Sequence, residues 1–516
     1  MTRLSAATLS LLASAGIASA QGRPMDWASY GGDAQRTGWE KSDSRITKDN
    51  IKDFQLVLKH KLGAGPAASN ALTPPVLIGM LISYRGFKEL AFVTNGSGDV
   101  WAIDADLDRI FWQKRFGAAA GKAKRGSAAC SGAPIAIPAL TPPMNFAAGR
   151  PRPGTPPRPP AAVNPDAPPK PMRVGGTGFG TPRSVFMLTG DGMLHQLNSS
   201  DGSDQFPPLK FVPASARASS LTLQDGIIYT TTSAGCGGAP DAVWAMDLND
   251  ANPQPVSYAL TTGAPGGIGG FALGQDGTVY VQTSSGKEAG ALLALSPKDL
   301  KLKQSFTIPG SGSVTPVVFP WKGKELVLAA GKQGSLYLLD GQELGGADHK
   351  TPLYQTAPLA SANDGIWGGL STWEDTDGTR WVLAPVWGPF SSEMKAFASN
   401  GPAPTGSIVA FKVEDHDGKP TLAPGWVSRD MTAPEPPVIT GGSVFVVSSG
   451  GAPRKPSASS HATLYALDAA TGKEIYSTGD QVTARANLTG MTLANGRIYF
   501  TTADGTLYAF GVYLER

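Results

Sequence analysis

A short phrase that recurs along the chain constrains its fold more than any other feature of the sequence. The clearest copy, residues 463–477 (TLYALDAATGKEIYS), places Ala-x-Asp at the end of a short apolar run, Thr-Gly in a turn, and an aromatic residue four positions later. The first copy, residues 99–113, keeps Ala102, Asp104 and Trp112 at the same spacing. Weaker copies occupy residues 193–206, 242–258, 291–306, 335–344, 407–426 and 506–516. The chain is therefore built from one repeated unit.

A second hairpin signal precedes several copies of this phrase. Asp-Gly or Asn-Gly stands ahead of a tyrosine at residues 225–229, 276–280 and 495–499. Such dipeptides between apolar residues favour tight β-turns. Each unit then has four short strands, A to D, and the units repeat roughly every 45 to 60 residues. Four short antiparallel strands per repeat are typical of a propeller blade. The sequence predicts an all-β fold, an eight-bladed β-propeller of four-stranded antiparallel blades.

The last unit is incomplete, and this predicts how the ring closes. Its copy at residues 506–516 ends after the third strand, C. The N-terminal stretch 54–62 (FQLVLKHKL) has the pattern of the missing fourth strand, D. A ring closed by an N-terminal strand leaves no open edge between the first and last blades. We expect one domain over residues 21–516.

The composition fits this fold and excludes some classes of function. Charged residues make up 16% of the chain, hydrophobic residues 41%, and there are 64 Gly and 43 Pro. This chain is too apolar for a disordered protein and too rich in turn residues for a helical one. Its net charge of +3 gives no case for a nucleic acid partner, which requires a clustered basic face.

The N-terminus has the pattern of a secretory signal peptide, predicted over residues 1–20. Arg3 provides the positive charge, residues 9–17 form a short apolar run, and residues 18–20 (ASA) form a cleavage site. The apolar run is too short to span a bilayer, and no transmembrane segment is expected elsewhere. We expect a secreted or periplasmic protein; the alternative interpretation is a frayed N-terminal helix.

Two further features bear on the exported state. The only cysteines, Cys130 and Cys236, would form one disulfide in an oxidising compartment, or else remain as two buried thiols. Residues 141–182 are rich in Pro, Ala and Arg and predict an extended insertion between strands A and B of blade two. That insertion is either an inert linker or a contact for an acidic surface or lipid headgroups.

The repeated phrase resembles the tryptophan-docking repeat of the pyrroloquinoline quinone (PQQ) dehydrogenases, the quinoprotein alcohol dehydrogenase-like family. It also resembles the related outer-membrane assembly lipoprotein with the same propeller. As a fold, the resemblance covers nearly all of the mature chain. It implies that an aromatic residue at the last position of the repeat wedges between neighbouring blades. The residues in this structural role would be Trp112, Phe206, Trp426 and Tyr476.

Propeller topology places the B–C and D–A loops on one face, which the resemblance implies is the ligand face. Blades three, four, six and seven have long B–C loops, and both cysteines map to this face. Long loops on one face favour a functional role. We expect a small molecule or a protein to bind there, and we expect the protein to be a monomer.

Polar residues precede the inner strands on this face and are the candidate site residues. They are Asn70, Arg217, Asp364, Glu435, Arg485 and Asn487. Together they would bind an anionic ligand or a divalent ion; singly, they would cap strand ends and bind water. In the phrase GIWGGLSTW, Trp367 is either a stacking platform for a flat ligand or a core residue, and Gly368 and Gly369 would permit close approach near the axis.

Two functions remain open. The chain lacks adjacent cysteines, a Cys-x-x-Cys-His site, a Gly-x-Ser-x-Gly elbow and a His-Glu-x-x-His motif, and its five histidines are scattered. The first hypothesis is a secreted binding module. The alternative is a PQQ- and calcium-dependent alcohol or sugar dehydrogenase, for which PQQ and calcium would be the cofactors and Asp364 or Glu435 the catalytic base. The metal-ligand set is not assigned.

Overall fold

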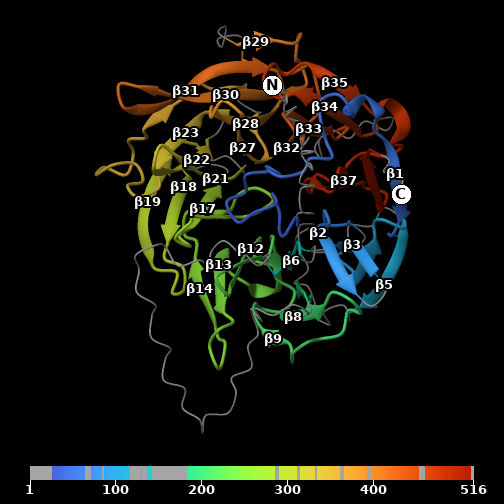
Figure 1. Ribbon diagram of the computed structural model, residues 1–516. Helices are drawn as coiled ribbons and strands as arrows, with labels where there is room; N and C mark the ends of the chain where they lie inside the picture. The colour runs from blue at the N-terminus through green and yellow to red at the C-terminus, as the bar shows by residue number, and fades with distance from the viewer. Residues whose placement is uncertain are drawn as a thin grey trace, which may run out of the picture.

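The strands form eight mainly antiparallel sheets in a ring around one axis (Figure 1), and the two-residue strands β20 and β26 form a separate parallel pair. This confirms the predicted all-β, eight-bladed propeller. The structure, a computed structural model, describes residues 26–63, 71–83, 86–116, 130, 136–141, 183–284, 290–310, 314–331, 334–360, 365–391, 397–451 and 460–512. In this part of the chain, no helix has the length and apolar character needed to cross a membrane. The predicted signal peptide lies outside it.

The first four blades follow one another along the chain. Blade one comprises β2 (Val76–Ser83), β3 (Gly86–Thr94), β4 (Asp99–Asp104) and β5 (Arg109–Arg115). Blade two comprises β6 (Ala139–Leu140), β7 (Ser184–Leu188), β8 (Met193–Asn198) and β9 (Leu209–Lys210). Blade three comprises β10 (Arg217–Ala218), β11 (Thr222–Gln224), β12 (Ile227–Ser233), β13 (Ala242–Asp247) and β14 (Pro255–Ala259). Blade four comprises β15 (Ala264–Pro265), β16 (Ala272–Leu273), β17 (Val279–Ser284), β18 (Gly290–Leu295) and β19 (Leu302–Ile308).

The remaining blades complete the ring. Blade five comprises β21 (Val317–Trp321), β22 (Lys324–Ala330), β23 (Leu336–Asp340) and β24 (Tyr354–Gln355), preceded by β20 (Val314–Thr315). Blade six comprises β25 (Gly365–Ile366), β27 (Ser371–Glu374), β28 (Arg380–Trp387), β29 (Ala398–Ser399), β30 (Gly406–His416) and β31 (Lys419–Val427), with β26 (Gly368–Gly369) beside β20. Blade seven comprises β32 (Val438–Thr440), β33 (Ser443–Ser448), β34 (Thr463–Asp468) and β35 (Glu474–Ser477). Blade eight comprises β36 (Thr492–Ala494), β37 (Arg497–Thr501), β38 (Thr506–Gly511) and β1 (Gln55–Lys61). Among the described residues, the short 3-10 helices η1 (Ile51–Asp53), η3 (Cys236–Gly238) and η5 (Gly479–Gln481) lie in the connections.

Ring closure takes place as predicted. The N-terminal strand β1 pairs antiparallel with β38 near the C-terminus, from Gln55 opposite Gly511 to Lys61 opposite Thr506. The sheet order β1-β38-β37-β36 therefore makes β1 the outer strand of blade eight. Because the outermost strand comes from the other end of the chain, blade eight cannot form without both termini.

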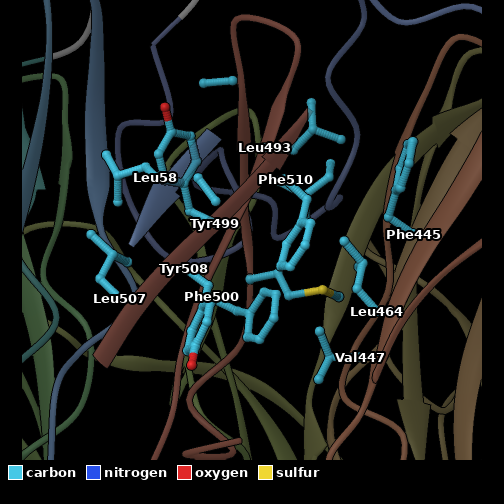
Figure 2. Close-up of a cluster of buried hydrophobic side chains, with 14 of the residues drawn as sticks. Leu58, Phe445, Val447, Leu464, Leu493, Tyr499, Phe500, Leu507, Tyr508 and Phe510 are labelled. Atoms are coloured by element: carbon cyan, nitrogen blue, oxygen red, sulfur yellow. The ribbon is translucent and has the colours of Figure 1, made fainter. Parts of the chain in front are cut away.

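The hydrophobic core lies between blades, because successive side chains of a strand point to opposite faces of its sheet. In β4, Val100 and Ala102 pack in a cluster shared with blade two, whereas Trp101 packs in a cluster shared with blades seven and eight. Figure 2 shows part of this second cluster, in which the aromatic rings of Phe500 and Phe510 belong to blade eight. Each sheet thus buries both faces against its neighbours.

The two tryptophans among the predicted docking residues, Trp426 and Trp112, make the same contacts with the next blade. Trp426, 1% exposed, donates its indole N–H to the Ala469 carbonyl of blade seven at 2.9 Å. A Cβ at Gly472 would lie 2.3 Å from its ring, so the indole lies directly against that glycine. Trp112 of blade one donates to the Ser199 carbonyl of blade two at 2.9 Å and covers Gly202 in the same way.

The other two predicted docking residues differ from this pattern. Tyr476 of blade seven meets Phe54, just before β1, edge to face at 5.8 Å between ring centroids. Phe206 is half-buried in the connection between β8 and β9. The contact with a glycine of the next blade is therefore shown only for the two tryptophans among these four residues, against Gly202 and Gly472.

The Pro-rich insertion joins two strands of blade two. β6 ends at Leu140 and β7 begins at Ser184, so residues 142–182 connect the innermost strand to the second strand. Those residues themselves lie outside the described part of the chain.

Candidate binding face

The loops between strands B and C, and those between one blade and the next, lie on the face predicted to bind ligands. Here the structure joins Cys130, between blades one and two, to Cys236, in the B–C loop of blade three. The two Cα atoms lie 5.5 Å apart, and neither cysteine is free. The disulfide is therefore present, and it crosses from the entry of blade two to blade three on this face.

Glu435, a predicted catalytic base, lies deep below this face. Its side chain is 1% exposed, and its carboxylate Oε2 accepts the Gly490 backbone N–H of blade eight at 2.7 Å. Burial raises the pKa of Glu435 to about 7, while backbone N–H groups of Gly490 and Leu488 lower it. The carboxylate therefore links blades seven and eight.

Trp367 lies between β25 and β26 and is half-buried. Its indole stacks on Trp387 at the end of β28, with ring centroids 4.8 Å apart and planes 23° apart. The Trp387 indole N–H in turn donates to the Pro434 carbonyl at 2.9 Å, next to Glu435. This partner could not be predicted from local spacing, because a whole hairpin separates Trp387 from Trp367 in the sequence.

The remaining predicted residues are spread around the ring. Asn487 donates to the Leu72 carbonyl at 3.4 Å and to Thr501 Oγ1 at 3.1 Å, and so joins blade eight to the start of blade one. Arg485, two residues earlier, is exposed. Arg217 is the first residue of β10 in blade three and is half-buried. Asn70 and Asp364 lie outside the described residues.

These contacts bring part of the predicted set together. Three separate hydrogen bonds, from Trp387 to the Pro434 carbonyl, from Gly490 to Glu435, and from Asn487 to the Leu72 carbonyl, join blades six to seven, seven to eight, and eight to one. Arg217 lies on blade three. The described side chains therefore do not converge on one ligand as a closed ring of polar groups.

A residue that the sequence analysis did not single out, Tyr30, lies at the axis. Its ring is 6% exposed and fits between glycines of three blades: Cβ atoms built at Gly269, Gly369 and Gly490 would lie 2.7, 3.0 and 2.8 Å from its atoms. Burial raises the pKa of Tyr30, so it is a neutral phenol at physiological pH. The one local signal is the aromatic and glycine-rich stretch 27–39, which has no counterpart in the repeat.

The described residues do not fit a calcium-bound quinone. Within the described ranges, no three side chains of His, Cys, Asp or Glu gather as metal ligands would. The Glu435 carboxylate already binds backbone N–H groups, and Asn487 is bonded to backbone and hydroxyl oxygens. A calcium site needs about six or more oxygen ligands, which this set does not provide.

Comparison with known proteins supports the fold. Residues 425–512 match the family model described as outer membrane protein assembly factor BamB. No curated protein matches the sequence. Among solved structures, the quinohemoprotein alcohol dehydrogenase from Comamonas testosteroni gives a TM-score of 0.57 at 14% identity, over 95% of this chain and 81% of that one.

Two other solved structures are similar in the same way. Quinohemoprotein alcohol dehydrogenase ADHIIG from Pseudomonas putida HK5 gives a TM-score of 0.56 at 10% identity, over 95% of this chain and 80% of that one. A europium-containing methanol dehydrogenase gives a TM-score of 0.52 at 12% identity, over 95% of this chain and 98% of that one. At such identities the likeness shows the fold alone. The predicted resemblance to the quinoprotein alcohol dehydrogenase-like propellers is confirmed as a likeness of fold.

Proposed function

We propose that this protein is an exported binding propeller, without dehydrogenase activity, that takes a protein partner on the face of the B–C and D–A loops. The observation that carries the proposal is the state of Glu435. A general base must reach the proton that it removes. This carboxylate is 1% exposed and accepts a backbone N–H, so it holds two blades together instead.

The chemistry of the face favours a protein partner. Trp367 and Trp387 form a half-buried aromatic pair. Arg485 is exposed and stands two residues before Asn487 in the sequence. Tryptophan and arginine are the residues that most often dominate protein–protein binding energy. The match of residues 425–512 to an outer membrane protein assembly factor supports the same class of partner.

The first arm of the test concerns catalysis. The mature protein is supplied with PQQ and calcium, and dye reduction is measured with a panel of alcohols and sugars. We expect no turnover above a protein-free control. Turnover that disappears in Glu435→Gln would overturn the proposal in favour of the dehydrogenase.

The second arm concerns the face. A photo-cross-linking amino acid is placed at Arg485, and, as the matched control, at Thr376, an exposed residue of the β27–β28 turn on the opposite face. In producing cells we expect a discrete cross-linked protein from position 485, lost in Trp387→Ala, and none from position 376. Equal cross-linking from both positions, or none from 485, would contradict a specific partner on this face.

A further inference from the structure

The segment Trp27–Asp43, which we name the axial segment, lies inside the ring and contacts every blade. Figure 1 shows it in blue at the centre of the propeller. Its backbone bonds to blade one at Leu77, blade two at Leu140, blade four at Leu273, blade five at Val318, blade six at Thr372 and blade seven at Ile439, over 2.8–3.0 Å. It reaches blade three through Arg36 and blade eight through Asp43, which accepts the Gly496 N–H at 2.6 Å.

These backbone contacts fall at the same place in each blade. Leu77, Leu140 and Leu273 are each the second residue of the innermost strand, or of its second section, and Val318, Thr372 and Ile439 hold the same position in blades five to seven. An innermost strand has a free edge toward the axis, with N–H and C=O groups that need partners. The axial segment supplies those partners one blade at a time.

Arg36 is the centre of this arrangement. Its guanidinium is 2% exposed and donates to Phe271 O at 2.9 Å, Tyr30 O at 2.7 Å, Ser29 Oγ at 3.2 Å, Ser220 Oγ at 3.0 Å and Thr222 Oγ1 at 2.6 Å. Burial lowers the pKa of Arg36 to about 10, which leaves it a cation at neutral pH. Three of these five neutral oxygens, on Phe271, Ser220 and Thr222, belong to the wall of the ring, and the other two belong to the axial segment itself.

Tyr30 makes the second specific contact. Its ring lies against Gly269, Gly369 and Gly490, which precede the innermost strands of blades four, six and eight. A side chain at any of these positions would collide with the ring. The wall is therefore shaped for an aromatic residue at one level of the axis and for an arginine at another.

We infer that the interior of the ring is a peptide-binding site, and that the axial segment is its ligand, held by non-covalent contacts independently of its connection to β1. The ligand class is a peptide with a tyrosine followed by an arginine six residues later, folded through turns in which Gly31, Gly32 and Arg36 have positive φ. This inference goes beyond the proposed function and does not depend on what binds to the outer face.

The test cuts the full-length chain after it has folded. A protease recognition sequence is inserted after Ser44, which is exposed and follows the last contact at Asp43. After cleavage, the axial segment has no covalent link to the ring, because the disulfide lies elsewhere. We expect it to co-elute with the ring in gel filtration, to appear in native mass spectrometry as a 1:1 complex, and to exchange with a synthetic peptide of residues 21–44.

A matched pair of variants gives the specificity of the site. Arg36→Met and Lys41→Met remove the same charge from the same segment, but Lys41 is exposed and stacks over Trp39. After cleavage we expect Arg36→Met to release the segment about tenfold faster or more, and Lys41→Met to behave as the parent. If Arg36→Met does not fold, Thr222→Val in the wall, which removes one acceptor, is measured in its place.

Circular dichroism is recorded on each cut protein. Immediate loss of the segment from the cut parent, with a ring that keeps its β spectrum, would overturn the inference. Equal release from Arg36→Met and Lys41→Met, or from Thr222→Val and the parent, would overturn the assigned specificity. Either result is independent of the dye-reduction and cross-linking measurements above.

Discussion

Two regions hold neighbouring blades together, and they differ in how visible they are in the sequence. On the outside, Trp112 and Trp426 each lie over a glycine of the next blade and donate to a backbone carbonyl there. On the inside, the axial segment meets all eight blades through different residues. The outer contact is repeated and therefore produces a repeated phrase. Each blade meets a different residue of the axial segment, so the inner contacts produce no repeated phrase in the sequence.

The comparison also separates two kinds of glycine. Gly472 of the repeat makes room for the indole of the preceding blade, whereas Gly490 makes room for Tyr30 at the axis. Both are close-approach positions, yet only the first belongs to the repeat. A glycine outside the repeated phrase is thus as informative about packing as one inside it, once its neighbour is known.

The largest effect is expected at the outer contact. Trp426→Ala removes a fully buried indole and its hydrogen bond, and should lower the free energy of unfolding by about 3–5 kcal/mol. Trp112→Ala should cost less, about 2 kcal/mol, because Trp112 is half-buried. Chemical denaturation followed by tryptophan fluorescence and by far-UV circular dichroism measures both. Equal losses in the free energy of unfolding for the two variants would show that the burial of the indole does not determine how much each outer contact stabilises the ring.

Glu435 gives a pH-dependent test at the boundary between the two regions. Its pKa is raised to about 7 in the folded protein, so its ionisation is disfavoured there relative to the unfolded chain. The contribution of this group to the free energy of unfolding of the parent should therefore be most favourable at low pH. It should fall as the pH rises from about 4.5 to about 7.

Glu435→Gln removes that titration and keeps an oxygen that can accept the Gly490 N–H. The difference between variant and parent in the free energy of unfolding should therefore grow toward neutral pH, to about 3 kcal/mol. Denaturation curves at pH 4.5, 6 and 8 measure it. A difference that stays constant over this range would mean that the carboxylate is not protonated preferentially in the folded state.

The smallest effect is expected at the axis from a single methyl group. Gly490→Ala places a Cβ 2.8 Å from the Tyr30 ring at a φ of +94°, and should cost about 1–3 kcal/mol. Gly323→Ala is the matched control, because its φ is +80° and nothing lies within 4 Å of the added Cβ. The excess cost at Gly490 should shrink in a Tyr30→Ala background. If both alanines cost the same, backbone conformation alone explains the loss and Tyr30 does not touch Gly490.

The sequence predicted what the repeat controls. The number of blades, the order of strands and the pairing of the first strand with the last all follow from one phrase and its truncated final copy. The cysteines were placed on one face by the same topology, although a disulfide and two free thiols stayed open until the structure showed the bond.

The candidate site was harder to predict, because its contacts run between distant parts of the chain. Glu435 was a reasonable base from its position before an inner strand, but its partner is a backbone N–H of Gly490 in the next blade, which no side-chain pattern encodes. Trp367 was identified without Trp387, and Tyr30 was not singled out. Backbone partners and single aromatic contacts follow from the assembled ring and cannot be found from local spacing.

The pairing of β1 with β38 has a consequence for the order of events as the chain is made. The strand β1 is synthesised more than 400 residues before its sheet partners, Thr506 to Gly511. The axial segment likewise lacks some of its partners until blade eight has been synthesised, because Asp43 accepts the Gly496 N–H. The early blades can therefore stack on one another before the axial segment and β1 have all of their partners, and the ring closes once residues 506–511 have been synthesised. A chain that stops before Thr506 would leave β1 without its partner strand, whereas the axial segment would keep its contacts with blades one to seven.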